Sequence, residues 1–252
     1  MKIDVKFSES TTRFNANFRE ITEIKDGYSQ AEVDKMVADA TQEGYDEGYE
    51  AGKAEGGDNA LQYATQVNRM FNTAAFPDGY EMVVDMPNSP TNISEMFRVS
   101  YGLRKLELIV PTDRTYNASY FVYGSATNRS TLEEMVLPDR IKFSNFSNFA
   151  LRCYALKTVS GSIDLSESTT NENCFSTCPE LTELRFVPGT ITESLSFNQS
   201  AKLSDASIAS IVNGLADLTL QTAQSVTLNG EVTGKLTDDQ KKEIITKNWD
   251  IG

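Results

Sequence analysis

The apolar residues in the centre of the chain recur in one pattern. In the clearest copy, Leu181, Leu184 and Phe186 follow Phe175, and Pro188-Gly189 ends the unit. The Leu-x-x-Leu-x-Phe spacing places apolar side chains on one face of a short strand that follows a packed turn. The pattern therefore predicts a repeated unit with a buried strand at its end.

Further copies of this unit occur on both sides of it. Successive apolar anchors are 29, 24, 25 and 22 residues apart, at Leu103, Leu132, Leu156, Leu181 and Leu203. These four intervals lie within the range of leucine-rich repeats, about 20–29 residues. Because one such unit cannot bury its apolar face alone, the units must stack. We therefore expect leucine-rich repeats over residues 77–203, as a short and irregular solenoid.

The segment CFSTCPELTELRFVP, residues 174–188, resembles one unit of the bacterial surface-antigen (BspA-like) leucine-rich repeats. Those units are written roughly as Ala-Phe-x-x-Cys-x-x-Leu-x-x-Ile-x-Ile-Pro. Residues 150–165 match in part, with Cys153 three residues before Leu156, and the resemblance covers about residues 93–203. It implies an exported or surface-displayed protein.

The N-terminal segment has a different pattern. Residues 2–8 alternate between polar and apolar and predict a strand, with a second strand ending near residue 24. A helix is expected over about residues 29–76, beginning at the capping box of Ser29 and Glu32. This segment also carries the candidate oligomerisation or anchoring residues, which are Val33, Val37, Gly44, Gly48, Gly52 and Gly56.

The four glycines, spaced every four residues, allow two interpretations. Each costs a helix about 0.8–1.0 kcal/mol relative to alanine, which favours a flexible acidic linker. The regular spacing also leaves a smooth stripe where another backbone can approach closely. We prefer the second interpretation, in which residues 1–76 form a coiled-coil-like anchor and the chain is a homo-oligomer, most simply a trimer.

The C-terminal segment, residues 204–252, is expected to be a helical cap on the repeats. Ser204 can cap a helix over residues 205–215, and Thr237 with Gln240 forms a capping box for a second helix. Residues 225–228 predict a short strand between them, and Trp249 is expected to fill the core. With the N-terminal segment, these elements give an expected α+β fold class.

The composition of the chain excludes several classes of function. The chain has 252 residues, a net charge of −13 and no histidine, so nucleic acid would be repelled and no Ser-His or Cys-His pair can form. No apolar run is long enough for a transmembrane helix, and the start lacks the apolar part of a signal peptide. We expect no enzyme activity, no cofactor, no metal and no membrane insertion.

The cysteines occupy a repeated position. Cys153 and Cys178 each lie three residues before an anchor leucine, and Ser100 and Ser200 take this place in other copies. A position that accepts cysteine or serine is expected to be small and tightly packed. A disulfide between Cys174 and Cys178 is the alternative.

An aromatic and amide-rich stretch is the candidate binding surface. Its residues are Tyr116, Asn117, Tyr120 and Tyr123. Tyrosines supply rigid contact area and amides supply adaptable hydrogen bonds, a combination typical of recognition surfaces. Phe146 and Phe149 in the following loop are weaker candidates of the same kind. The alternative is that all these aromatic side chains fill the interior of the repeats.

The order of the segments along the chain indicates where the protein could be displayed. A short N-terminal strand, a Gly-Tyr-x-x-Gly-Tyr segment and surface-antigen repeats together resemble tail-associated virion proteins of phages that infect gut Firmicutes. The resemblance implies attachment to other virion proteins through the N-terminal segment, and display of the repeats to a host-surface protein or glycan at the tail or baseplate. A bacterial cell-surface adhesin is the alternative.

Overall fold

The computed structural model describes residues 70–87, 89–125 and 130–252. These residues form ten strands: β1 (Ala75–Asp85), β2 (Tyr101–Ile109), β3 (Thr115–Asn117), β4 (Glu134–Val136), β5 (Ile141–Asn145), β6 (Thr158–Ser160), β7 (Ile163–Asp164), β8 (Leu195–Phe197), β9 (Gln224–Leu228) and β10 (Trp249–Ile251). They also form three helices: α3 (Asp205–Gly214), α4 (Gly230–Lys235) and α5 (Asp238–Thr246).

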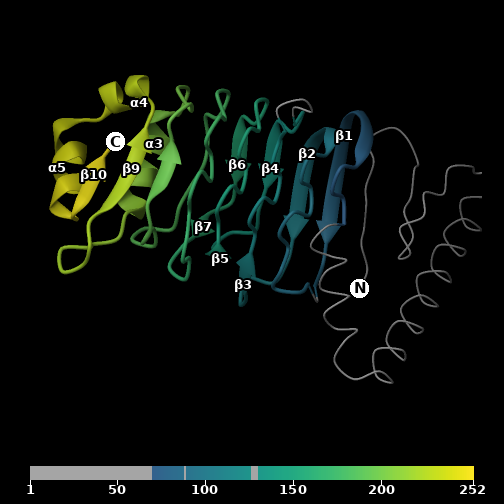
Figure 1. Cartoon of the computed structure of the whole chain (residues 1–252), viewed down its shortest axis with the longest axis horizontal. Coiled ribbons are helices and arrows are strands. Elements are labelled where there is room, and N and C mark those ends of the chain that lie inside the picture. The colour runs from purple at the N-terminus through teal and green to yellow at the C-terminus, as the bar shows by residue number, and fades with distance from the viewer. Residues whose placement is uncertain (1–69, 88, 126–129) are drawn as a thin grey trace, which may run out of the picture.

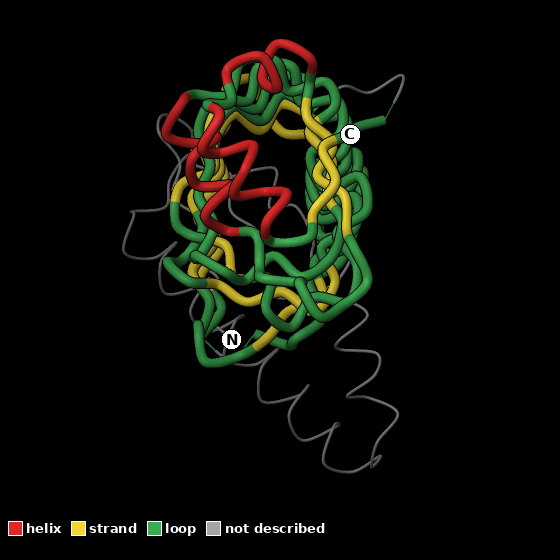
Figure 2. Tube along the Cα trace, turned by 90° about the vertical axis from the view of Figure 1, so that its left-hand side faces the viewer, coloured by secondary structure: helices red, strands yellow, loops and turns green. Residues whose placement is uncertain are grey.

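The chain winds in stacked turns along the longest axis of the molecule (Figure 1). Viewed along that axis, the turns superimpose on one oval outline, and the helices gather at the C-terminal end (Figure 2). Strands β1, β2, β4 and β6 form one parallel sheet in that order. Leu106 pairs with Met135, and Met135 pairs with Val159, so successive turns place an apolar residue at the same point of the sheet.

A second parallel sheet has the order β3-β5-β7. Each of three successive turns supplies a strand to both sheets, as β2 with β3, β4 with β5, and β6 with β7. Tyr116 pairs with Phe143 between β3 and β5, and Ile141 pairs with Ile163 between β5 and β7. The second half of each of these turns therefore also pairs in a parallel sheet, with a register shift between Tyr116 and Asn117.

This arrangement corrects the expected fold class. In place of an α+β leucine-rich-repeat solenoid with one strand in each unit, the described residues form a mixed α/β fold of three parallel sheets with few helices. The reason lies in residues such as 141–145, where Ile141 and Phe143 are buried and Lys142 between them is partly exposed. This alternation favours a paired strand over a connecting loop.

The C-terminal segment is also corrected, because it is not a helical cap alone. β8, β9 and β10 form a third parallel sheet, with β9 in the centre. The predicted helix starts are confirmed, since Ser204 caps α3 and the capping box of Thr237 and Gln240 opens α5. Trp249 is buried, and its indole Nε1 donates a hydrogen bond to the carbonyl oxygen of Ala216 at 2.9 Å, as expected of a core residue.

A column of phenylalanines runs through the core. Neighbouring rings in the column have centroids 4.9–5.9 Å apart, and its members are Phe71, Phe97, Phe121, Phe149, Phe175 and Phe197. All five predicted anchor leucines are buried in the same cluster, which extends from Phe71 to Trp249. The predicted burial of the anchors is therefore confirmed, and the described turns share one core.

The irregular turns are bonded to one another as well. Alternate backbone N–H groups donate to the next turn, as from Phe97 to the carbonyl oxygen of Phe121 and from Val122 to that of Phe149. Left-handed backbone positions recur in pairs four residues apart, at Glu95 and Val99, at Asn148 and Arg152, and at Asn173 and Thr177. These three turns therefore share one backbone shape, which the turn of Tyr120 follows in part.

The repeated cysteine position is confirmed as a buried, small one. The thiols of Cys153 and Cys178 donate to backbone carbonyl oxygens of the preceding turn at 2.7 and 3.0 Å. The Ser200 hydroxyl makes the same type of contact at 3.3 Å, to Phe175. Cys153, Cys174 and Cys178 are all free, so the structure contains no Cys174–Cys178 disulfide.

We expect Cys178→Ser to change the free energy of unfolding by less than about 1 kcal/mol, because a serine hydroxyl can make the same hydrogen bond. Cys178→Leu overfills the site and should cost about 1–3 kcal/mol. Urea denaturation, with and without reducing agent, measures both effects. A strong loss of stability on adding reducing agent to the wild type would contradict this account.

The predicted N-terminal elements lie outside the described residues. These are the strands within residues 2–24 and most of the helix expected over residues 29–76. The expected end of that helix is wrong, because residues 70–73 form a turn and β1 begins at Ala75. The expected boundary between residues 76 and 77 therefore falls inside β1. The three-part division into residues 1–76, 77–203 and 204–252 stays a prediction.

Candidate functional site

Tyr116 lies in the core. It belongs to β3 and is fully buried, and its hydroxyl donates to the carbonyl oxygen of Pro111 at 2.8 Å and accepts from Ser89 at 3.1 Å. Burial raises the pKa of Tyr116 above its ordinary value. Of the two interpretations of the aromatic stretch, Tyr116 fits the one in which the ring fills the interior.

Asn117 has a structural contact. Its Oδ1 accepts a hydrogen bond from the backbone N–H of Ser119 at 3.2 Å, which closes an Asx turn. Asn92-x-Ser94 and Asn145-x-Ser147 do the same in the adjacent turns, and the three asparagines are paired across the sheet. The recurring Asn-x-Ser motif is therefore a sequence signal for the end of the strand in these turns, as at the ends of β3 and β5.

Tyr120 and Tyr123 join two arginines at the surface, and we call Arg98, Tyr120, Tyr123 and Arg152 the Tyr-Arg cluster. The two phenol rings meet edge to face, with centroids 5.5 Å apart. The guanidinium carbon of Arg98 lies 5.6 Å from the Tyr120 centroid and 5.7 Å from that of Tyr123. Arg152 lies 6.0 Å from the Tyr123 centroid, so two cations share one ring.

The backbone fixes these side chains across three stacked turns. The Val99 N–H donates to the carbonyl oxygen of Tyr123 at 2.7 Å, which joins the Arg98 turn to the tyrosine turn. The Tyr120 N–H donates to Ser147 at 3.1 Å, which joins the tyrosine turn to the Arg152 turn. Tyr120 has φ of 56°, a left-handed conformation that turns its side chain away from the core. Main-chain hydrogen bonds therefore fix the relative positions of the three turns that carry the cluster.

The two arginines differ in their charge partners. Arg98 pairs with Glu95, with Nη1 and Oε2 3.0 Å apart. Arg152 forms no ion pair with any residue in the described ranges, and its Nη1 donates to the Tyr123 hydroxyl at 3.1 Å. The cluster thus carries a positive charge that its own carboxylate does not neutralise.

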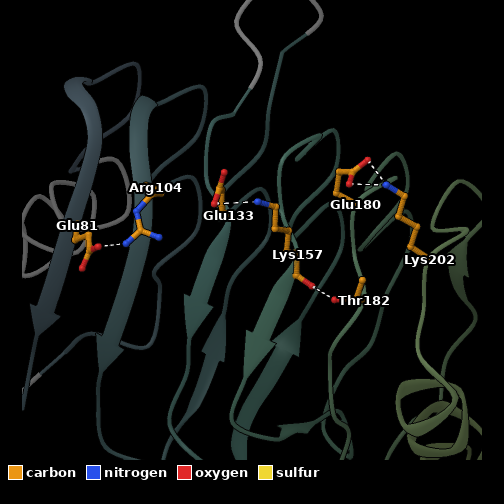
Figure 3. A network of polar contacts seen from close by, with 7 residues as sticks. All are labelled: Glu81, Arg104, Glu133, Lys157, Glu180, Thr182 and Lys202. Carbon is orange, nitrogen blue, oxygen red and sulfur yellow. Dashed lines mark hydrogen bonds and ion pairs between the residues drawn. The ribbon is translucent and has the colours of Figure 1, made fainter.

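A set of ion pairs lies on the side of the first sheet. Each joins two neighbouring turns, and the pairs are Glu81 with Arg104, Glu133 with Lys157, and Glu180 with Lys202 (Figure 3). Thr182 adds a hydrogen bond from its hydroxyl to the Lys157 carbonyl oxygen at 2.9 Å. These half-exposed pairs contribute about 0–1 kcal/mol each. Each carboxylate is paired with a cation of a neighbouring turn, so we interpret these pairs as stabilising contacts between turns.

The cysteines do not form a reactive site. All three are buried, and desolvation raises the pKa of Cys153 to about 12 and that of Cys178 well above its ordinary value. They therefore stay thiols, whereas a nucleophilic cysteine needs the thiolate. Among the described residues, no group of His, Cys, Asp and Glu side chains could hold a metal ion.

The other residues that the sequence singled out lie either outside the described ranges or in the core. Val33, Val37, Gly44, Gly48, Gly52 and Gly56 lie outside the described residues. Phe146 and Phe149 are fully buried and belong to the core. No helix in the described ranges has the length and apolar character needed to cross a bilayer.

Sequence reasoning found Tyr120 and Tyr123 but missed Arg98 and Arg152. The arginines lie five residues before Leu103 and four before Leu156, so an alignment of the units would bring them near one another. The inserted residues before Leu132 obscure their proximity to Tyr123.

Comparison of the chain with known protein families, with curated proteins and with solved structures finds no match.

Proposed function

We propose that this protein is a non-enzymatic virion component of a phage tail or baseplate, which displays its stacked turns outward and recognises the host surface through the Tyr-Arg cluster. The N-terminal segment would attach it to other virion proteins and hold a homo-oligomer together, most simply a trimer. The observation that carries the recognition role is the cluster itself, in which four large side chains from three turns gather outside the core.

The composition of the cluster supports this role. Tyrosine and arginine are enriched among the residues that dominate binding energy at interfaces. The inter-turn hydrogen bonds hold the backbone of both tyrosines before any partner binds, which reduces the conformational entropy lost on binding. A stack of turns needs no such cluster for its stability, because the phenylalanine column and anchor leucines already form the core.

The virion setting rests on the order of segments along the chain. An alternating N-terminal segment, a glycine- and tyrosine-rich acidic segment and surface-antigen-like units follow one another. Immunogold labelling of native particles with antibodies against the purified chain tests this setting, and label at the tail tip or baseplate is expected.

Purified full-length chain is expected to compete with native particles for adsorption to host cells. The double variant Tyr120→Ser, Tyr123→Ser should compete at least about tenfold less well, because loss of two central aromatic contacts exceeds 1.4 kcal/mol. Arg185→Gln, an exposed arginine far from the cluster in sequence, is the matched surface control and should compete as the wild type does.

Equal competition by the double variant and the wild type would overturn the assignment of the cluster. Absence of competition by the wild type, together with particles that carry no label, would overturn the virion role.

A further inference from the structure

We propose that the Tyr-Arg cluster binds a carboxylate-bearing sugar, such as a uronic acid or sialic acid unit of a host-surface glycan. This inference rests on the recognition role proposed above and adds the chemical class of the ligand. It is carried by the unpaired charge of Arg152, the free edge of its guanidinium group and the adjacent tyrosine rings.

The charge of the cluster favours an anion. The guanidinium carbons of Arg98 and Arg152 each lie no more than 6.0 Å from the centroid of the Tyr123 ring. Glu95 balances Arg98 but no described carboxylate balances Arg152. In a chain with a net charge of −13, such a locally positive site is suited to discriminate in favour of an anionic group.

The free edge of Arg152 favours a carboxylate in particular. Its Nη1 is committed to the Tyr123 hydroxyl, whereas its Nε and Nη2 donate to no residue in the described ranges. Two parallel N–H groups of a guanidinium match the two oxygens of a carboxylate, which gives a bidentate, charge-assisted pair. The bond to Tyr123 orients the guanidinium before the ligand binds, because it restricts rotation of the planar group.

The tyrosines favour a sugar ring next to that carboxylate. An aromatic face is electron-rich, so the weakly positive C–H groups of a pyranose ring pack against it. The Tyr120 hydroxyl has no hydrogen-bond partner among the described residues, and it can exchange hydrogen bonds with a sugar hydroxyl. Inorganic phosphate would meet the arginine but gain nothing from the two rings.

The test is calorimetric titration of the full-length chain with a panel of uronic acid and sialic acid oligosaccharides. The methyl ester of each, which keeps the sugar and removes the charge, is the matched ligand control, and inorganic phosphate is the anion control. At least one acid should bind, its ester about tenfold or more weakly, and phosphate more weakly than the acid. Arg152→Gln should weaken binding of the acid at least about tenfold, Arg152→Lys should restore part of the loss, and Arg185→Gln should leave it unchanged.

Several results would overturn the inference. Equal binding of an acid and its ester would show that the carboxylate is not recognised, and an equal loss in Arg152→Gln and Arg185→Gln would indicate nonspecific attraction. If no acid on the panel binds while the chain still competes with particles through Tyr120 and Tyr123, the ligand class is wrong and the recognition role stands. If the wild type neither binds an acid nor competes, both proposals fail.

Discussion

Replacing Phe149 with alanine is expected to lower the free energy of unfolding by about 3–5 kcal/mol. The ring is fully buried, and it lies within 5.9 Å, centroid to centroid, of the rings of Phe121, Phe143, Phe146 and Phe175. Because these neighbours come from three turns, the cavity removes contacts within one turn and between turns. Chemical denaturation followed by circular dichroism measures the loss.

Two further variants make this prediction specific. Phe149→Leu leaves a smaller cavity and should cost about 1–2 kcal/mol. Tyr101→Ala removes a ring that is 42% exposed, and its effect should stay within about 0.5 kcal/mol. If Phe149→Ala destabilised the protein no more than Tyr101→Ala does, the phenylalanine column would not be a shared core.

Gly102→Ala is expected to cost about 2–5 kcal/mol. Gly102 has φ of +84°, where a side chain costs about 1–2 kcal/mol. A Cβ at this position would also overlap the backbone carbonyl of Phe76 in the neighbouring strand β1. That carbonyl can move only if β1 shifts, which adds about 1–3 kcal/mol of overpacking.

Gly79→Ala separates the two causes. Gly79 has almost the same conformation, with φ of +80°, but a Cβ there would meet no atom within 4 Å. Its variant should therefore lose only the conformational part, about 1–2 kcal/mol. Urea denaturation of both variants gives the difference directly. Equal losses would mean that β1 and β2 can separate at this point without cost.

The buried anchor leucines could be predicted because each unit shows the apolar spacing of a buried strand face. Leu181, Leu184 and Phe186 have the spacing of one strand face, and all three are buried. The strands of the second sheet have a weaker sequence pattern. β3 and β7 have only three and two residues, too few for an alternation to be recognised, and they are held by pairing with residues more than 20 positions away. Such pairing depends on the register between turns, which one unit alone does not specify.

In the candidate site, the sequence pattern of residues 116–123 was likewise not enough to predict which tyrosines are buried. Tyr116 and Ala118 are buried, so simple alternation would also bury Tyr120. The left-handed φ at Tyr120 breaks the alternation, so Phe121 and Val122 are both buried and Tyr120 faces outward. A non-glycine residue adopts this conformation only where the surrounding structure enforces it, and here the hydrogen bonds to adjacent turns do so. The sequence therefore identified the tyrosines as a group but could not separate the inward one from the outward ones.

The pairing of each turn with only its immediate neighbours also affects how the gene can change. Parallel strands lie about 4.7–4.9 Å apart, so an in-frame duplication of one turn would lengthen the molecule by about that distance. The added turn would find the same hydrogen-bond partners above and below it. Since the Tyr-Arg cluster lies on the turns of β2, β4 and β6, duplication between β7 and β8 would lengthen the stack without altering the cluster. The length of the stack and the composition of the cluster could then change independently.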